Sequence, residues 1–165
     1  MRALVIFESM FGNTEKIAEA IADGLSETMT VDTVEVGSAD DSVDGVDLLV
    51  VGGPTHAFGM SRESTRKSAA DRGAGTVASK AGGIRDWIAT AHGDGTLFAT
   101  FDTKADHPHL PGSAAHAARR QLRRRGFRPF AAATSFYVTD LEGPLAAGEV
   151  ERARRWGQQL GLART

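Results

Sequence analysis

The stretch at residues 2–14 is RALVIFESMFGNT, and it joins two kinds of secondary structure through a polar turn. Its first part, Arg2 to Phe7, is a short apolar run rich in branched side chains, typical of a buried strand. A polar segment with a glycine follows, from Glu8 to Asn13. Residues 14–26 then place Ile17, Ala18, Ile21 and Leu25 on one face, as an amphipathic helix does. The stretch therefore predicts a strand, a tight turn and a helix.

The rest of the chain repeats this alternation. We expect strands at residues 30–36, 47–53, 96–101 and 131–138, and helices at residues 62–92 (in two pieces), 113–125 and 145–160. Strands that alternate with helices favour a parallel sheet with helices on both faces. Five strands in 165 residues fit an α/β, doubly wound, five-stranded parallel sheet of order 2-1-3-4-5. We expect a single domain over residues 1–165, with the alternating strand at 30–36 nearer an edge.

The composition is 41% hydrophobic and 24% charged, with no cysteine. The lack of cysteine excludes disulfides, thiol nucleophiles and thiolate metal sites. The apolar stretch near the amino terminus ends at Glu8, which makes it too short for a signal peptide or a membrane span. We expect a soluble, cytoplasmic protein.

The formal net charge of −2 conceals an uneven distribution along the chain. Residues 1–60 hold two basic and eleven acidic side chains, whereas residues 61–128 hold thirteen basic and six acidic ones. The basic part includes a cluster formed by Arg119, Arg120, Arg123, Arg124, Arg125 and Arg128. This cluster is either the solvated face of a helix or a surface that docks an acidic redox partner. It lacks interleaved aromatic residues, so we do not expect nucleic acid as a partner.

Ligands of open α/β sheets bind beyond the carboxyl ends of the strands, where the strand order reverses. The loop Ser9–Thr14 lies at that point and leads into a helix, whose amide groups and dipole form an anion site. No Lys or Arg lies in the loop, so a phosphate would be held by neutral donors. The alternative is a plain N-capping turn, with Asn13 or Thr14 as the cap.

Two further loops would complete the same crevice. Residues 52–61, GGPTHAFGMS, include His56 and Phe58, which could stack on a planar ring. The alternative is a turn that places Phe58 in the core. Residues 100–104, TFDTK, would form a third loop after the fourth strand.

Taken together, the motif Ser-x-x-Gly-Asn-Thr, the motif Gly-Gly-Pro-Thr after the third strand and the strand order resemble the flavodoxin family over nearly the whole chain. The resemblance implies FMN as the cofactor, with its phosphate on Ser9, Met10, Phe11, Gly12, Asn13 and Thr14. It also implies that the flavin ring lies near Pro54, Thr55, His56, Ala57, Phe58, Gly59, Phe101, Asp102, Thr103 and Lys104.

The chain departs from the family pattern in three ways. Phe11 stands where many flavodoxins have Thr or Ser, and the third loop lacks the Tyr that often covers the flavin ring. Flavodoxins that carry electrons are usually acidic around the flavin, whereas the expected rim here holds Arg62, Arg66, Lys67, Arg72 and Lys104. Lys104 is either a solvated side chain or a cation that stabilises the reduced, anionic flavin and raises its potential.

Two other motifs are weak. Residues 73–78, GAGTVA, fit a dinucleotide pattern but follow a basic polar segment and not a strand, so we expect no nicotinamide site. Asp106, His107 and His109 lie in one short segment, and we expect no metal there.

We expect an FMN-binding electron-transfer flavoprotein that exchanges electrons with a partner protein, either a reductase or an electron acceptor, and needs no catalytic residue. The alternative is an FMN-dependent reductase, for example of quinones, in which His56 or His107 could donate a proton. A further alternative is a binding module that keeps the flavodoxin fold and does not retain FMN.

Overall fold

The computed structural model describes residues 1–55, 60, 83–106, 112–140 and 142–165. Its strands form one parallel sheet in the order β2-β1-β3-β4-β5, and β6 also pairs with β4. This confirms the predicted doubly wound sheet. The strands are β1 (Arg2–Phe7), β2 (Thr30–Glu35), β3 (Leu48–Pro54), β4 (Leu97–Ala105), β5 (Arg128–Pro129) and β6 (Thr134–Val138).

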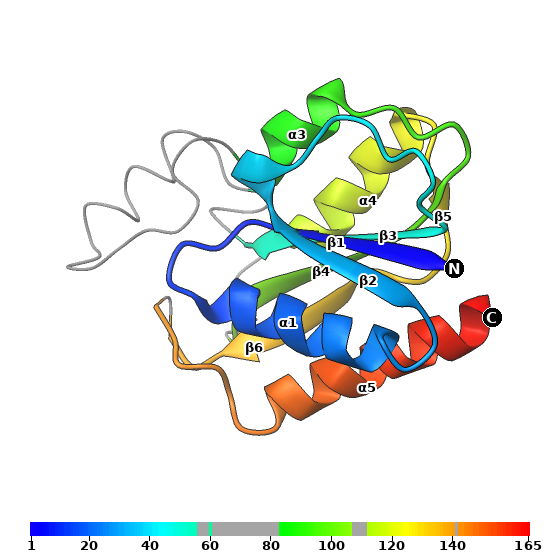
Figure 1. Ribbon diagram of the computed structural model, residues 1–165. Helices are drawn as coiled ribbons and strands as arrows, with labels where there is room; N and C mark the ends of the chain where they lie inside the picture. The colour runs from blue at the N-terminus through cyan, green and yellow to red at the C-terminus, as the bar shows by residue number, and fades with distance from the viewer. Residues whose placement is uncertain (56–59, 61–82, 107–111, 141) are drawn as a thin grey trace.

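Helices cover both faces of the sheet. They are α1 (Asn13–Leu25), α3 (Ile84–Thr90), α4 (Ala114–Arg124) and α5 (Glu149–Arg164), with a short 3₁₀ turn, η1 (Val36–Ser38). In Figure 1, α1 and α5 lie side by side below the sheet, while α3 and α4 lie above it. No helix in the described part of the chain is long and apolar enough to cross a lipid bilayer.

The alternation of side chains along the central strands produces two hydrophobic cores. Val5 and Val50 point into the core beneath α1 and α5, whereas Ile6 and Val51 point into the core beneath α3 and α4. Because both faces are covered, β1 and β3 are almost entirely apolar. In contrast, β2 is half exposed and forms one edge of the sheet, as its alternating sequence predicts.

The fourth strand is longer than predicted, and this changes the nature of the expected third loop. β4 continues to Ala105 because Pro54 of β3 pairs with Thr103, and Tyr137 of β6 pairs with Lys104. Residues 100–104 are therefore strand and not loop. The prediction of a loop there is wrong, because two neighbouring strands supply backbone partners that the local sequence does not reveal.

The last strand is split into two segments. β5 and β6 both run parallel to β4 and replace the single strand predicted at residues 131–138. The final helix begins at Glu149, later than the predicted residue 145. Leu145 instead forms an antiparallel bridge with Val138, and this bridge keeps the preceding residues extended.

The predicted helices agree well elsewhere. α1 and α4 each begin and end within one residue of the predicted bounds. Of the two helical pieces expected in residues 62–92, the second contains α3, with Ile84, Trp87 and Ile88 buried as its apolar stripe predicts. The first piece lies outside the described residues.

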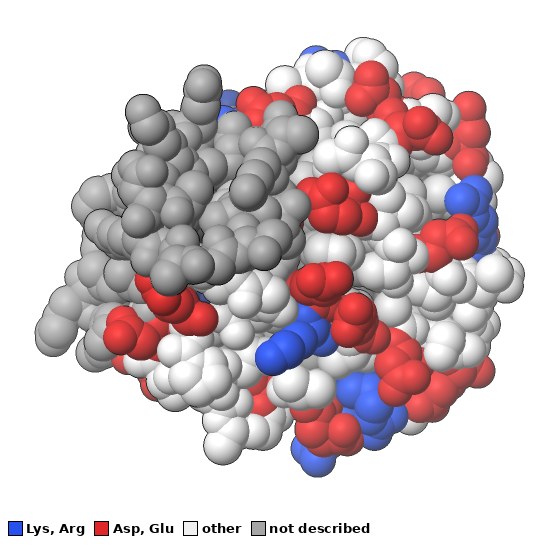
Figure 2. Space-filling view, turned by 60° about the vertical axis from the view of Figure 1, so that its left-hand side comes forward, with Lys and Arg blue, Asp and Glu red and all other residues white. Residues whose placement is uncertain are grey.

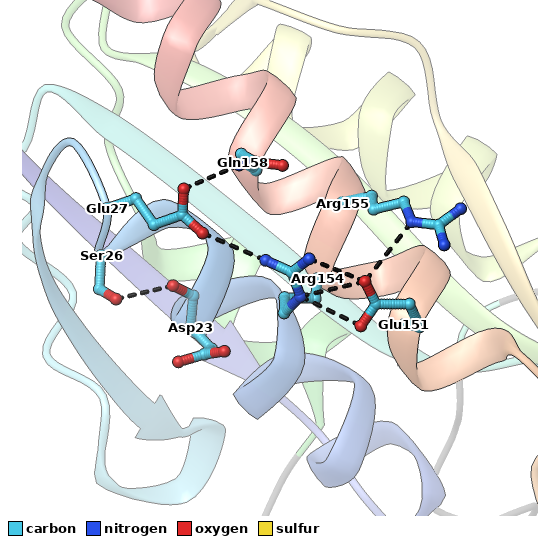
Figure 3. A network of polar contacts seen from close by, with 7 residues as sticks. All are labelled: Asp23, Ser26, Glu27, Glu151, Arg154, Arg155 and Gln158. Atoms are coloured by element: carbon cyan, nitrogen blue, oxygen red, sulfur yellow. Dashed lines mark hydrogen bonds and ion pairs between the residues drawn. The ribbon is translucent and has the colours of Figure 1, made fainter.

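A polar network joins α1 to α5 along their exposed sides (Figure 3). Arg154 of α5 contacts Glu27, beyond the end of α1, at 3.1 Å and Glu151 at 2.7 Å. Gln158 also donates a hydrogen bond to Glu27 at 2.8 Å. The network fixes the carboxyl end of α1 against α5.

Candidate functional site

The loop after β1 folds back on itself before it enters α1. Gly12 has a φ of 87°, which favours glycine, and its amide donates a hydrogen bond to the Ser9 hydroxyl at 3.0 Å. Ser9 and Met10 are buried, and Phe11 is half-buried against Met10. The side chains of Ser9 and Met10 therefore point into the protein, and the backbone of the loop leads into α1.

The amino terminus of α1 has no side-chain cap. Its N-cap residue is Gly12, so the interpretation of Asn13 or Thr14 as a conventional cap is wrong. Within the residues that the structure describes, nothing accepts a hydrogen bond from the amides of Asn13, Thr14 and Glu15. These amides and the helix dipole suit an anion.

Two of the other helices that begin at this edge of the sheet, α3 and α4, already hold a protein carboxylate. Glu8 Oε1 accepts a hydrogen bond from the Ile84 amide of α3 at 2.8 Å. Asp102 Oδ2 accepts one from the Ala115 amide of α4 at 3.0 Å. Both carboxylates are buried. The starts of α1 and α5 both lack a side-chain cap. Because α5 carries two acidic residues in its first turn and α1 carries one, α1 is the better candidate for an external anion.

The carboxyl ends of β1, β3 and β4 meet as the sequence predicts. The hydroxyls of Thr14 and Thr103 share a buried hydrogen bond of 2.7 Å. The Thr55 amide donates to the Thr103 carbonyl at 2.8 Å, and the Thr55 hydroxyl donates to Asp102 at 3.1 Å. Three segments that are far apart in sequence, the start of α1, the end of β3 and the end of β4, are thus linked directly at one end of the sheet.

Asp102 and Thr55 together hold the start of α4. Asp102 Oδ2 accepts from the Ser113 hydroxyl at 2.5 Å, in addition to its bonds with Thr55 and Ala115. The Thr55 hydroxyl in turn accepts from the Ala114 amide at 3.0 Å. Asp102 Oδ1 is buried and has no hydrogen-bond partner among the described residues. We expected Asp102 and Thr55 beside the flavin ring. In the structure, Asp102 Oδ2 and the Thr55 hydroxyl form hydrogen bonds with the protein itself.

Phe101 lies in the hydrophobic core. Its ring makes edge contacts with Phe136 and Trp156, with centroids 6.4 Å away in each case. It also lies against Gly52, where an added Cβ would come within 2.1 Å of the ring. The glycine at position 52 is therefore required by the packing of Phe101, and the Phe101 side chain is part of the core.

Lys104 follows Asp102 on the same face of β4. Its ammonium group donates a hydrogen bond to the Gly112 carbonyl at 3.1 Å, and the side chain is partly exposed. Lys104 thus contacts the segment that leads into α4.

Pro54 ends β3, in register with Thr103. Other expected site residues lie outside the described residues: His56, Ala57, Phe58 and Gly59 of the second loop, Arg62, Arg66, Lys67 and Arg72 of the rim, residues 73–78, and His107 and His109.

A small cavity lies between the ends of β3 and β4 and the starts of α3 and α4. Its volume is about 10 Å³, enough for about one water molecule and far too small for a flavin ring. It is lined by Glu8, Gly52, Gly53, Pro54, Met60, Ile84, Phe101, Ala114 and Ala118.

Sequence reasoning missed two features of this edge. One is the hydrogen bond from the start of α3 to Glu8. The position of an acidic residue directly after an apolar strand could have indicated it. The other is the segment after β6, where the Glu142 carbonyl accepts a hydrogen bond from the side-chain amide of Asn13 at 3.0 Å. Gly143, beside it, has a φ of 103°, and an added Cβ would lie 2.7 Å from the Asn13 side chain. A backbone contact of this kind leaves no recognisable motif.

Comparisons with known proteins agree with this arrangement. Residues 5–85 match the family model for flavodoxin. Among solved structures, oxidised Flavodoxin 1 from Bacillus cereus is 20% identical, covers 97% of both chains and has a TM-score of 0.66. A flavodoxin from the domain Archaea is 17% identical over 99% of both chains, with a TM-score of 0.69.

A short-chain flavodoxin associated with a non-canonical PDU bacterial microcompartment is 15% identical, with a TM-score of 0.71 over 100% of this chain and 99% of that one. At these identities the structures share the fold. No curated protein matches the chain at a significant level. Residues 5–85 thus match the flavodoxin family, and the chain has the flavodoxin fold along nearly its whole length.

Proposed function

We propose that this protein binds FMN and acts as an electron carrier. The observation that carries the proposal is the start of α1, where the amides of Asn13, Thr14 and Glu15 have no acceptor within the described residues. A phosphate group bound there would supply the acceptor oxygens and the negative charge that the helix dipole favours. When bound, FMN would supply the one- or two-electron chemistry that the side chains lack.

The protein residues around this position would bind and orient the cofactor. Gly12 allows the tight turn that directs the amides of α1 outward, and the Thr14–Thr103 hydrogen bond fixes the turn against β4. Thr55 and Asp102 fix the loop after β3 against α4. Outer-sphere electron transfer needs no acid or base, so no side chain is assigned a proton-transfer role.

FMN binding is tested by the absorption spectrum of the purified protein and by titration with FMN, followed by quenching of flavin fluorescence. Riboflavin, which has the same ring and no phosphate, is the matched control. We expect FMN to bind much more tightly than riboflavin, because the start of α1 holds the phosphate. Equal binding of the two would contradict the phosphate assignment, and no binding of either would refute the function.

The carrier role is tested separately, by steady-state turnover with NAD(P)H and a quinone. We expect negligible turnover of the FMN-loaded protein alone, and electron transfer when a reductase or acceptor protein is added. Sustained quinone reduction without such a partner would instead favour an FMN-dependent reductase. A protein that ignores FMN would be a flavodoxin-fold binding module.

A further inference from the structure

A group of arginines covers the outer face of α4 and the start of β5. We call it the arginine patch; it consists of Arg119, Arg120, Arg123, Arg124, Arg125 and Arg128. Arg120, Arg123, Arg124 and Arg128 are exposed, and the other two are half-buried. No member forms an ion pair with a described residue, whereas Arg152 and Arg154 of α5 each do. The positive charge of the patch is therefore not neutralised by neighbouring carboxylates of the described fold.

The helix itself does not need this concentration of charge. Ala115, Ala118 and Leu122 bury the inner face of α4, so its attachment to the sheet is apolar. Arg119 with Arg123, and Arg120 with Arg124, are like charges spaced four residues apart, which destabilises a helix. Arg123 and Arg124, in the last turn, interact favourably with the helix dipole, but this accounts for only part of the patch.

The arginine patch lies away from the proposed cofactor site. Asp102 and Thr55 contact the beginning of α4, whereas the patch occupies its later turns and continues to Arg128, which pairs with Leu97 at the start of β4. In Figure 1, α4 runs from the grey loops toward the edge of the sheet that carries β5. At ~1.5 Å per residue, Arg123 lies about 14 Å beyond Ala114 along the helix. That exceeds the Debye length of ~8 Å at physiological salt, so Arg123 and the members beyond it act only weakly on the cofactor.

We propose that the arginine patch docks an acidic surface of a partner protein, at a position separate from the loops of the proposed FMN site. Guanidinium groups bind carboxylates through paired hydrogen bonds, and the four exposed members of the patch supply such groups, whereas Arg125 donates a hydrogen bond to the Ala91 carbonyl at 2.9 Å. A partner bound there would leave the carboxyl-terminal edge of the sheet accessible.

The charge of the whole molecule favours an acidic protein over a nucleic acid. The net charge is −2, and residues 1–60 are strongly acidic. Figure 2 shows a face on which Asp and Glu are widely spread, while Lys and Arg gather in a few places. A long polyanion would be repelled by such surfaces, whereas a compact acidic patch would meet α4 alone. The exposed large apolar residues of the described part, Met1, Tyr137, Val150 and Leu162, lie outside the patch, so it offers no platform for stacking bases.

The test uses the full chain and a short, fluorescently labelled oligoglutamate peptide, with binding followed by anisotropy. The variant R120E/R123E reverses two exposed charges of the patch. Its control, K16E/R155E, makes the same change in net charge on exposed residues of α1 and α5. We expect the patch variant to lose about tenfold or more in affinity, the control to stay within about twofold, and wild-type binding to weaken as salt is added.

Equal losses in both variants would show attraction by net charge and would overturn the proposal, as would wild-type protein that does not bind the peptide. A short DNA duplex is tested in parallel. If the duplex binds more tightly than the peptide and R120E/R123E abolishes that binding, the patch is a nucleic-acid site and the proposal fails. FMN affinity should be the same in R120E/R123E and wild type. Failure of the wild type to bind FMN would refute the proposed function and leave this test valid.

Discussion

Asp102 connects three segments of the chain through a single carboxylate oxygen. Its Oδ2 atom accepts hydrogen bonds from Thr55, Ser113 and the amide of Ala115, and the residue is completely buried. Charge-assisted bonds at the start of a helix are stronger than neutral ones. The carboxylate therefore holds the loop after β3 and the beginning of α4 in a fixed relation.

We expect Asp102→Asn to lower the free energy of unfolding by about 1–3 kcal/mol, because a neutral amide weakens the three bonds and buries an additional donor. Urea unfolding of the apoprotein measures this. Ser113→Ala, which removes one of the three donors, should cost less. An unchanged urea midpoint for Asp102→Asn would mean that the charge of Asp102 does not contribute to stability.

At the scale of the elements, α1 and α5 pack closely because glycines lie where the helices meet. A Cβ added to Gly157 would lie 2.1 Å from the Ile21 carbonyl oxygen, and one added to Gly24 would lie 2.0 Å from the Arg154 carbonyl oxygen. The obstructing atoms are backbone atoms, which cannot rotate away. The two helices therefore sit at a separation that only glycine allows.

We expect Gly157→Ala to destabilise the protein by about 1–3 kcal/mol, the usual cost of overpacking. The better helix propensity of alanine, worth about 1 kcal/mol, offsets only part of this cost. Gln159→Ala, at an exposed position of the same helix, is the control and should be nearly neutral. Urea unfolding of both variants decides the matter: a Gly157→Ala protein as stable as wild type would show that the helices can separate freely.

The junction of β6 and α5 depends on an ion pair. Arg152 contacts Glu149 at 2.6 Å and lies over the ring of Phe136, with its guanidinium carbon 4.4 Å from the ring centroid. The hydrogen bond from Arg152, together with one from the Tyr137 amide, lowers the pKa of Glu149 below its ordinary 4.5, although burial opposes the shift. A carboxylate with a lowered pKa stabilises the fold above its unfolded pKa.

We expect this contribution to be present at neutral pH and to be lost as the pH falls from about 4.5 through the lower pKa of the folded state. In Glu149→Gln, the urea midpoint should fall less steeply with decreasing pH in that acidic range than in the wild type. Glu151→Gln should change this dependence less, because Glu151 is exposed and its pair with Arg154 is screened by solvent. Identical pH profiles for wild type and Glu149→Gln would contradict the prediction.

On the scale of the whole molecule, the two proposed binding sites lie at opposite ends of the sheet. The uncapped start of α1 and the linked loops lie at the carboxyl edge, and the arginine patch extends to the amino edge at β5. Parallel topology causes this separation, because every strand ends at the same edge and every helix returns to the other. The proposed cofactor and the proposed protein partner would therefore bind without competing.

A ligand that binds only the folded protein stabilises all of it. FMN at 100 times its dissociation constant should add about 2.7 kcal/mol, which raises the melting temperature of a chain this size by about 5–10 °C. Thermal unfolding with and without FMN measures the shift. Riboflavin at the same concentration should give a much smaller one, and an equal shift would show that the phosphate contributes nothing.

The sequence was sufficient to predict the strand order and most helices. Local patterns predict β1, β3 and α1. A strand buried on both faces is a continuous apolar run, whereas a helix buried on one face repeats its apolar residues every three or four positions. Gly12 indicated the tight turn before α1, whereas the anion site expected at Ser9–Thr14 stays a prediction.

The tertiary structure alone decided where β4 ends and what its residues contact. Residues 100–104 become strand because β3 and β6 pair with them, and Phe101 and Asp102 are therefore buried on opposite faces. It likewise decided that α3 and α4 receive carboxylates from Glu8 and Asp102, whereas α1 receives none from the described residues. Local sequence determines periodicity and turn geometry; partners far along the chain determine which backbone groups and charges are satisfied.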